Sequence, residues 1–148
     1  MIALDTNILV YAHRQDSPFH GPALGTLASL GNGTAPWAIP WACLHEFISI
    51  VTHPRIYNPP SPIDTAIAFL ENWLRSDSLH LLAEGPTHMA RLAELARTAK
   101  LAGPKIHDAR IAAVCLSHGV EVLYTADRDF SLFPGLTTKN PLLSLPTS

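Results

Sequence analysis

Short apolar runs alternate along the chain with longer stretches in which apolar residues recur at helical spacing. A short apolar run between turn-forming residues is typical of a strand that is buried on both faces of a sheet. We therefore expect strands over four ranges: residues 2–4, 37–39, 79–82 and 120–125. The segment after Pro134 shows no such pattern and is expected to form a loop.

The stretches between these runs predict helices, and glycine and proline mark their ends. In the first half of the chain, helices are expected over residues 23–30 and 42–52. A Gly-Asn-Gly turn at 31–33 ends the first helix. Pro54 ends the second, because the residue before a proline disfavours helical backbone.

Three further helices are expected in the second half. Ser61 followed by Pro62 predicts a helix start. This helix is expected to turn one apolar row inward: Ile63, Ala66, Ile67, Leu70, Trp73 and Leu74. Thr87 is expected to cap the next helix, and the last one is expected to run from the break at Gly103-Pro104 to a capping Gly119.

Strands that alternate with helices predict an α/β fold in one domain, residues 1–148, with a parallel sheet that helices cover on both faces. Functional sites in such folds form beyond the carboxyl ends of the strands. Asp5 directly follows the first expected strand, and Asp127 lies two residues beyond the last one. Both acids are therefore candidate site residues.

Two more carboxylates lie on apolar rows of the expected helices. Asp108 shares one row with Ile111 and Cys115, at spacings of three and seven residues. Glu46 lies three residues after Cys43 on a row that is otherwise apolar. Both positions favour carboxylates that face the interior of the fold.

Convergence of these four acids would be unfavourable without a cation. Two like charges about 4 Å apart repel by about 4 kcal/mol at an effective dielectric constant near 20. A divalent cation removes this repulsion, and ligands that are all oxygen suit Mg²⁺ or Mn²⁺. A metal-bound water can then attack a phosphodiester while the metal stabilises the developing charge.

Each acid also has a structural interpretation. Asp5 could cap a helix that begins near Thr6, and Asp108 could interact with the dipole at the start of its helix. Glu46 could be an ordinary surface residue, and Asp127 could belong to a turn. The placement of all four acids together favours a metal site over four independent explanations.

Composition limits the class of protein. The chain has 148 residues, of which 47% are hydrophobic and 15% charged, which excludes disorder. It lacks a signal peptide or an apolar run of roughly 18 residues, so we expect a cytoplasmic protein with no membrane segment and with Cys43 and Cys115 as buried thiols. The net charge of −2 argues only weakly against nucleic acid, because two divalent cations would bring it to about +2.

These features, taken in order, resemble a PIN-domain ribonuclease, specifically a VapC-type toxin of a bacterial type II toxin–antitoxin system. The matching segments are MIALDTNILVYAH, CLHEF, KIHDARIAAVCLSHG and VLYTADRDFSLFPGL, which together span nearly the whole chain. A further segment, VTHPRIYNPPSP, resembles one found in one branch of these toxins.

The resemblance implies a PIN-like α/β/α sandwich with a central, mainly parallel sheet, and an Mg²⁺- or Mn²⁺-dependent endoribonuclease that cleaves structured RNA and inhibits translation. It assigns the family's catalytic and metal-binding acids to four positions: Asp5, Glu46, Asp108 and Asp127. Three neighbours would orient carboxylates or water: Thr6, Thr125 and Asp129. The resemblance leaves open how Asp127 and Asp129 divide their roles.

The resemblance also implies partners: a homodimer, and a cognate VapB-type antitoxin whose tail crosses the acidic cleft. The RNA would be an exposed loop of transfer RNA or ribosomal RNA, where bases are unstacked. Four cations near the acids could contact its phosphates or could instead pair with acids: Arg14, Lys105, Arg110 and Arg128.

Other interpretations remain. The chain could be a PIN-like module that binds RNA or protein without cleavage, or a metal-dependent phosphatase. His45 and His107 each precede a key acid, but a neighbouring side chain on a helix points about 100° away, so neither is expected to bind metal. Trp37 and Trp41 are expected in the core or at a dimer interface. The chain contains no GxSxG, Walker A or GxGxxG motif.

Overall fold

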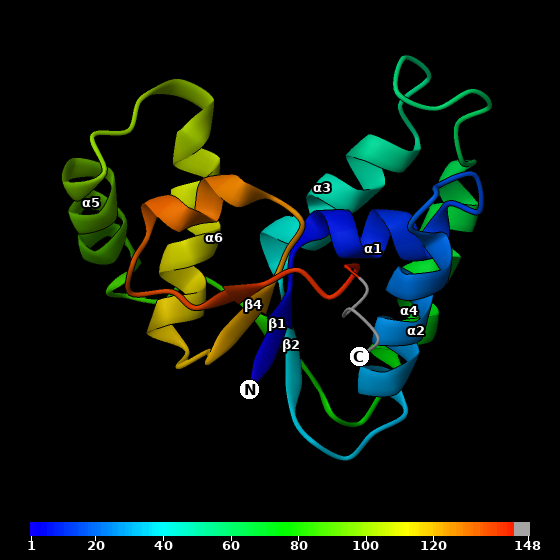
Figure 1. The fold of residues 1–148 in the computed structure, drawn as a ribbon, viewed down its shortest axis with the longest axis horizontal. Coiled ribbons are helices and arrows are strands. Elements are labelled where there is room, and N and C mark those ends of the chain that lie inside the picture. The colour runs from blue at the N-terminus through cyan, green and yellow to red at the C-terminus, as the bar shows by residue number, and fades with distance from the viewer. Residues whose placement is uncertain (144–148) are drawn as a thin grey trace.

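A single parallel sheet forms the centre of the protein in a computed structural model, which describes residues 1–143 (Figure 1). Every pairing between neighbouring strands is parallel, and the strand order is β3-β2-β1-β4-β5. The strands are β1 (Ile2–Leu4), β2 (Trp37–Pro40), β3 (Leu79–Leu82), β4 (Val122–Tyr124) and β5 (Thr138–Lys139).

Helices cover both faces of this sheet. Figure 1 shows α1, α2 and α4 to one side of the strands and α5 and α6 to the other. The helices are α1 (Thr6–His13), α2 (His20–Gly31), α3 (Trp41–Val51), α4 (Ile63–Leu74), α5 (His88–Thr98) and α6 (Ile106–Ser117). Two short 3₁₀ helices are η1 (Gly103–Lys105) and η2 (Arg128–Leu132). The predicted α/β/α architecture is confirmed.

The order of the strands creates a switch point between β1 and β4. From β1 the chain adds β2 and β3 on one side, and it later returns to place β4 and β5 on the other. Leu4 pairs with Tyr124 at the carboxyl ends of β1 and β4, and the Asp5 backbone N–H donates to the Tyr124 carbonyl at 2.9 Å. Ligand sites of open parallel sheets lie at such a point.

Large aromatic side chains fill the core on both sides of the sheet. Trp37 and Phe47 are completely buried, and Phe130 and Phe133 are nearly so. The Trp37 indole N–H donates to the Ser78 hydroxyl at 3.1 Å, so its polar atom is satisfied inside the fold. Both cysteines are free and buried, as predicted. None of the helices in residues 1–143 is long and apolar enough to cross a membrane.

The start of α4 differs from the sequence prediction. The residue that caps this helix is Pro62, and the Ser61 hydroxyl instead contacts His13 and Arg14 of another segment. Only Ala66 and Leu70 of the predicted apolar row are buried, whereas Ile63 is 52% exposed. Ile67 and Leu74 are also exposed, because the apolar row of α4 is wider than the surface it packs against.

Two other predictions need correction. Thr87 occupies the residue before α5, but its side chain makes no capping hydrogen bond within the described part of the chain. The segment after Pro134 is not entirely loop, because β5 pairs with β4 through Leu123 and Tyr124. Both β5 residues have exposed side chains, so their sequence carries no apolar signal of a strand. The prediction for residues 144–148 lies outside the described residues.

Candidate metal centre

Asp5 connects the sheet to the candidate site. It is 4% exposed and caps α1, where its Oδ1 accepts a hydrogen bond from the Thr6 backbone N–H at 2.7 Å. Its Oδ2 accepts a hydrogen bond from the Thr125 hydroxyl at 2.7 Å, across the switch point. Asp5 therefore both caps α1 and lies at the carboxyl end of β1, as each of the two interpretations predicted. Burial raises the pKa of this carboxyl.

A tight group of carboxylates lies next to Asp5. Asp127 follows β4 and caps η2, where its Oδ1 accepts a hydrogen bond from the Asp129 N–H at 2.8 Å. Asp108 lies in the first turn of α6. One oxygen each from Asp108, Asp127 and Asp129 lie within 4.8 Å of one another. Asp129, expected only to support the site, therefore belongs to its closest cluster.

The electrostatics show that all four predicted acids face one region. The pKa of Asp108 is raised to about 6, first by burial and then by the charges of Asp127, Asp129 and Asp5. The pKa of Glu46 is raised by burial and then by the charges of Asp5 and Asp108. Mutual repulsion among carboxylates favours protonation unless a cation is present.

The Thr6 hydroxyl supplies a separate test of a metal site. Its oxygen is buried beside the Glu46 and Cys43 side chains, but it makes no hydrogen bond of standard geometry with any of residues 1–143. A buried polar atom without a partner requires an explanation, such as an ordered water or an ion. The carboxylate oxygens and this hydroxyl together fit a hydrated Mg²⁺ or Mn²⁺, which prefers oxygen ligands.

A groove of about 640 Å³ leads to these acids, between α3 and α6. Its α3 wall consists of Ala42, His45, Glu46 and Ser49. Its other wall comes mainly from α6 and its approach: Pro104, Lys105, His107, Asp108, Arg110, Ile111 and Asp129. The Lys105 ammonium lies 3.4 Å from an Asp129 oxygen, and Arg110 pairs with Glu84. Cations and acids thus share one open groove.

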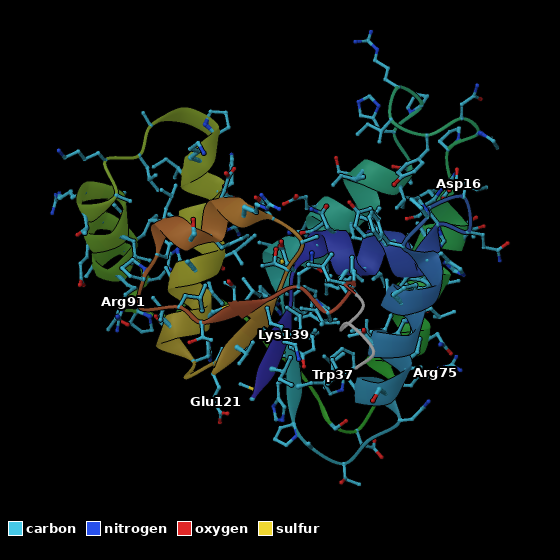
Figure 2. The ribbon with its side chains drawn as sticks, viewed as in Figure 1. Asp16, Trp37, Arg75, Arg91, Glu121 and Lys139 are labelled. Atoms are coloured by element: carbon cyan, nitrogen blue, oxygen red, sulfur yellow. The ribbon has the colours of Figure 1, made fainter. Side chains whose placement is uncertain are left out.

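Two of the four predicted RNA-contacting cations lie away from the groove walls. Arg14 directly follows the last residue of α1 and pairs with Asp16, whose position Figure 2 labels. Arg128 is exposed in the first turn of η2. His45 and His107 line the groove, but the cluster of three close carboxylates in the described chain includes neither.

One contact of the site was not predicted. The Cys43 thiol donates a hydrogen bond to Asp5 Oδ1, with the sulfur 3.8 Å from the oxygen. The sequence could have indicated this contact, because Cys43 lies three residues before Glu46 and this spacing places both side chains on the same side of α3. Trp37, predicted in the core or at an interface, is in the core, whereas Trp41 is 40% exposed.

Stability of the metal-free protein should depend on the Asp108 proton. The folded protein holds this proton up to about pH 6, whereas the unfolded chain releases it near 3.8. The free energy of unfolding should therefore decrease as pH rises from about 3.8 to about 6, because the folded state binds more protons than the unfolded state in this range. The free energy of unfolding can be measured with urea in the presence of EDTA. The Asp108→Asn variant should gain stability relative to wild type when the pH is raised from acid to neutral. A difference that is constant at all pH values would contradict this assignment.

The sequence matches the family model described as PIN domain over residues 2–136. The chain therefore belongs to the PIN-domain family, and the acidic groove lies within the matched region.

The relatives within this family are VapC ribonucleases, as the sequence resemblance predicted. The chain is 33% identical over 142 residues to Ribonuclease VapC43 of Mycobacterium tuberculosis, with 96% of each chain covered. It is 33% identical over 144 residues to Ribonuclease VapC31 of the same species, covering 97% of this chain and 100% of that protein.

Solved structures share the fold. VapBC2 from Rickettsia felis, bound to a DNA fragment from its promoter, superposes with a TM-score of 0.69 at 21% identity, covering 95% of this chain and 98% of that one. The sarcin–ricin loop cleaving toxin VapC20 of Mycobacterium tuberculosis gives a TM-score of 0.66 at 20% identity, covering 88% and 93%.

Proposed function

We propose that this protein is a VapC-type toxin, a divalent-metal-dependent endoribonuclease. The convergence of acids at the switch point of the sheet carries the proposal. They come from segments far apart in sequence: Asp5, Glu46, Asp108, Asp127 and Asp129. The full-length similarity to VapC ribonucleases supports the same reaction.

The residues of the chain divide the work of the site. Asp108, Asp127 and Asp129 would hold Mg²⁺ or Mn²⁺, with Glu46 and Asp5 completing the negative surface. When bound there, a divalent metal would supply a nucleophilic water and would stabilise charge on the phosphodiester. Thr125 holds the Asp5 carboxylate in place through its hydroxyl. The free Thr6 hydroxyl would orient a water, and Lys105 would attract phosphate into the groove.

The shape of the groove favours RNA over a small molecule. It is open along its length between α3 and α6, and its walls carry cations as well as acids. Such a groove suits one extended strand, as an exposed loop of transfer RNA or ribosomal RNA would present. The VapC20 structure is described as that of a toxin that cleaves the sarcin–ricin loop. Cleavage of such an RNA would inhibit translation.

The same groove suits an inhibitory partner. An arginine from a VapB-type antitoxin would match the clustered carboxylates, because its planar fork binds carboxylate oxygens in pairs. Related structures contain VapBC assemblies. We place the toxin and antitoxin in the cytoplasm and propose that the toxin is a homodimer; its mass in solution, measured by light scattering, tests the dimer.

Metal dependence gives a direct test. EDTA should suppress cleavage of total RNA, and Mg²⁺ or Mn²⁺ should restore it. The ion should also raise the melting temperature, since a ligand that binds only the folded state at a hundredfold excess over its Kd contributes about 2.7 kcal/mol. The Asp127→Asn variant should lose most of this thermal shift. Full activity in EDTA would refute the metal site.

Two other functions make different predictions in the same experiment. A PIN-like module without catalytic activity would bind RNA in the presence of Mg²⁺ or Mn²⁺ and would leave the RNA intact. A phosphatase would hydrolyse a small phosphomonoester and spare RNA. Mapping the new RNA ends would identify the substrate if the endoribonuclease proposal holds.

A further inference from the structure

The segment between α3 and α4, residues 52–62, projects beyond the body of the fold (Figure 1). We call it the 52–62 arm. Its exposed residues include Arg55 and Ile56, and Ile56 is 54% exposed. A projecting segment with a cation and an apolar side chain at its tip is suited to contact another molecule.

The helix α3 carries one wall of the acidic groove and ends where the arm begins. The groove-lining residues of α3 recur at helical spacing: Ala42, His45, Glu46 and Ser49. The next positions on this face are Thr52 and His53, where the arm begins. At 1.5 Å per helical residue, Thr52 lies about 9 Å along the helix axis beyond Glu46. A strand bound in the groove therefore reaches the arm within a few nucleotides of the acids.

Internal hydrogen bonds fix the shape of the arm tip. The His53 carbonyl accepts hydrogen bonds from the N–H groups of Ile56 and Tyr57, at 3.1 and 3.0 Å. The Arg55 N–H donates to His53 Nδ1 at 3.0 Å. At its root, the Ser61 N–H donates to the Val51 carbonyl at 2.7 Å.

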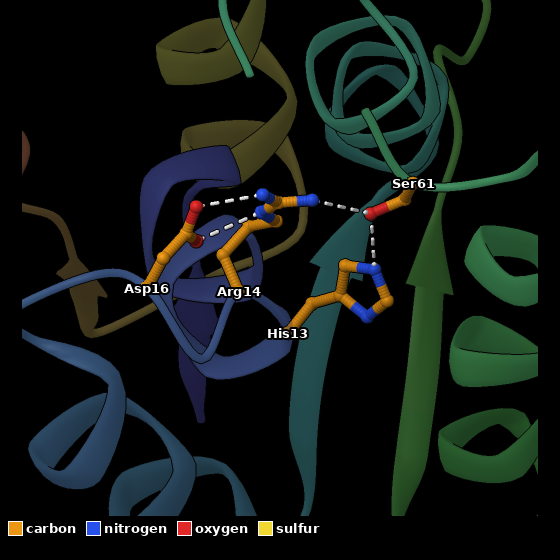
Figure 3. A network of polar contacts seen from close by, with 4 residues as sticks. All are labelled: His13, Arg14, Asp16 and Ser61. Atoms are coloured by element: carbon orange, nitrogen blue, oxygen red, sulfur yellow. Dashed lines mark hydrogen bonds and ion pairs between the residues drawn. The ribbon is translucent and has the colours of Figure 1, made fainter. Parts of the chain in front are cut away.

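A polar network fastens the arm to the end of α1 (Figure 3). The Ser61 hydroxyl lies 2.9 Å from His13 Nε2 and accepts a hydrogen bond from Arg14 at 3.2 Å. Burial, followed by the charges of Arg14 and His20, lowers the pKa of His13, which favours a neutral ring in this network. The Arg14 guanidinium also lies 4.3 Å from the centre of the Tyr57 ring. The arm is therefore anchored on both sides of its tip.

Three of the four cations predicted from sequence pair with acids, whereas the fourth, Arg128, is exposed and has no ion-pair partner among the described residues. Arg14 and Lys105 pair with Asp16 and Asp129, and Arg110 pairs with Glu84. Arg55 has no ion-pair partner within residues 1–143. A free guanidinium on a fixed backbone is suited to a phosphate, because little conformational freedom is lost on binding.

We propose that the 52–62 arm docks the RNA strand that enters the groove, with Arg55 on a phosphate and Ile56 against an unstacked base. The inference rests on the proposed ribonuclease function and deepens it, because it assigns a substrate-positioning surface outside the acidic cluster. Base contacts of this kind suit single-stranded loops, whose bases are accessible.

Binding of a fluorescein-labelled RNA stem–loop tests the arm. The Asp108→Asn variant serves as the background, so that the RNA stays intact, and Arg55→Ala is added to it. Arg75→Ala is the matched control, because Arg75 is exposed and follows the other end of α4, which is 12 residues and thus about 18 Å long (Figure 2). We expect Arg55→Ala to weaken binding by about tenfold and to reduce the slope of log affinity against log salt by about 0.7.

The outcomes separate the arm from the proposed function. In the active protein, Arg55→Ala should raise KM while kcat stays unchanged. Equal affinities and salt slopes for the Arg55→Ala and Arg75→Ala variants would overturn the arm. The proposal would also be overturned if Arg55→Ala left RNA binding unchanged but weakened the complex with the antitoxin. That result would assign the arm to a protein partner. If the wild type cuts no RNA but Arg55 still controls RNA binding, the arm stands and the ribonuclease proposal fails.

Discussion

Asp108→Asn is expected to reduce RNA cleavage by more than about a hundredfold. The substitution keeps the size of the side chain but removes a charge from the cluster with Asp127 and Asp129. Loss of a group that only supports a metal ligand typically costs 10–100-fold, so loss of a proposed ligand should cost more. The rate of cleavage of a labelled stem–loop under saturating Mg²⁺ measures the effect. Growth arrest on expression should disappear in parallel.

The matched control for this experiment is Asp64→Asn. Asp64 is exposed in the first turn of α4 and lies outside the groove, so its substitution changes the net charge equally. It should leave cleavage within about twofold of wild type, since surface substitutions usually change stability by no more than about 0.5 kcal/mol. An Asp108→Asn protein with full activity would defeat the proposed function.

Phe47→Ala should produce the largest loss of stability. The ring is completely buried, and its centre lies 5.4 Å from the centres of the Phe69 and His13 rings. Removal of a buried phenylalanine ring costs about 3–5 kcal/mol, because it removes apolar contacts and leaves a cavity. The midpoint of urea unfolding should fall with little change in the slope. Since Phe47 follows Glu46 on α3, cleavage should fall as well.

Phe19→Ala provides the comparison. Phe19 is 40% exposed and contacts the Tyr11 ring at a centroid distance of 5.3 Å. Its loss should lower the free energy of unfolding by about 1 kcal/mol or less, because solvent already reaches much of the ring. Similar losses for the two phenylalanine variants would contradict the difference in burial between Phe47 and Phe19.

The strands could be predicted where their sequence is apolar. β1 and β3 match the expected ranges, and β2 extends its range by one residue, because buried parallel strands require continuous apolar side chains. β4 is shorter than expected at both ends. The sequence did not predict β5, because Thr138 and Lys139 are exposed and carry no apolar pattern. Their extended conformation comes from pairing with β4.

The sequence indicated which acids gather at the candidate site, but it did not indicate which of them lie closest together. Strand-end and helix-row positions identified acids that the fold brings together, because the backbone period determines which side a residue faces. The place of Asp129 in the closest cluster depends on η2, a short turn without a periodic pattern. Arg14 could not be excluded from the groove by sequence, because its pairing with Asp16 depends on the path of the chain after α1.

Asp5 and Glu46 lie in the first third of the chain, whereas Asp108, Asp127 and Asp129 are added only near its end. A nascent polypeptide that stops before α6 contains Asp5 and Glu46 without the three later acids. Under the proposed function, copies terminated before α6 should therefore cleave no RNA. If the proposed function holds, the complete acidic cluster exists only once Asp129 has been added, late in synthesis of the chain.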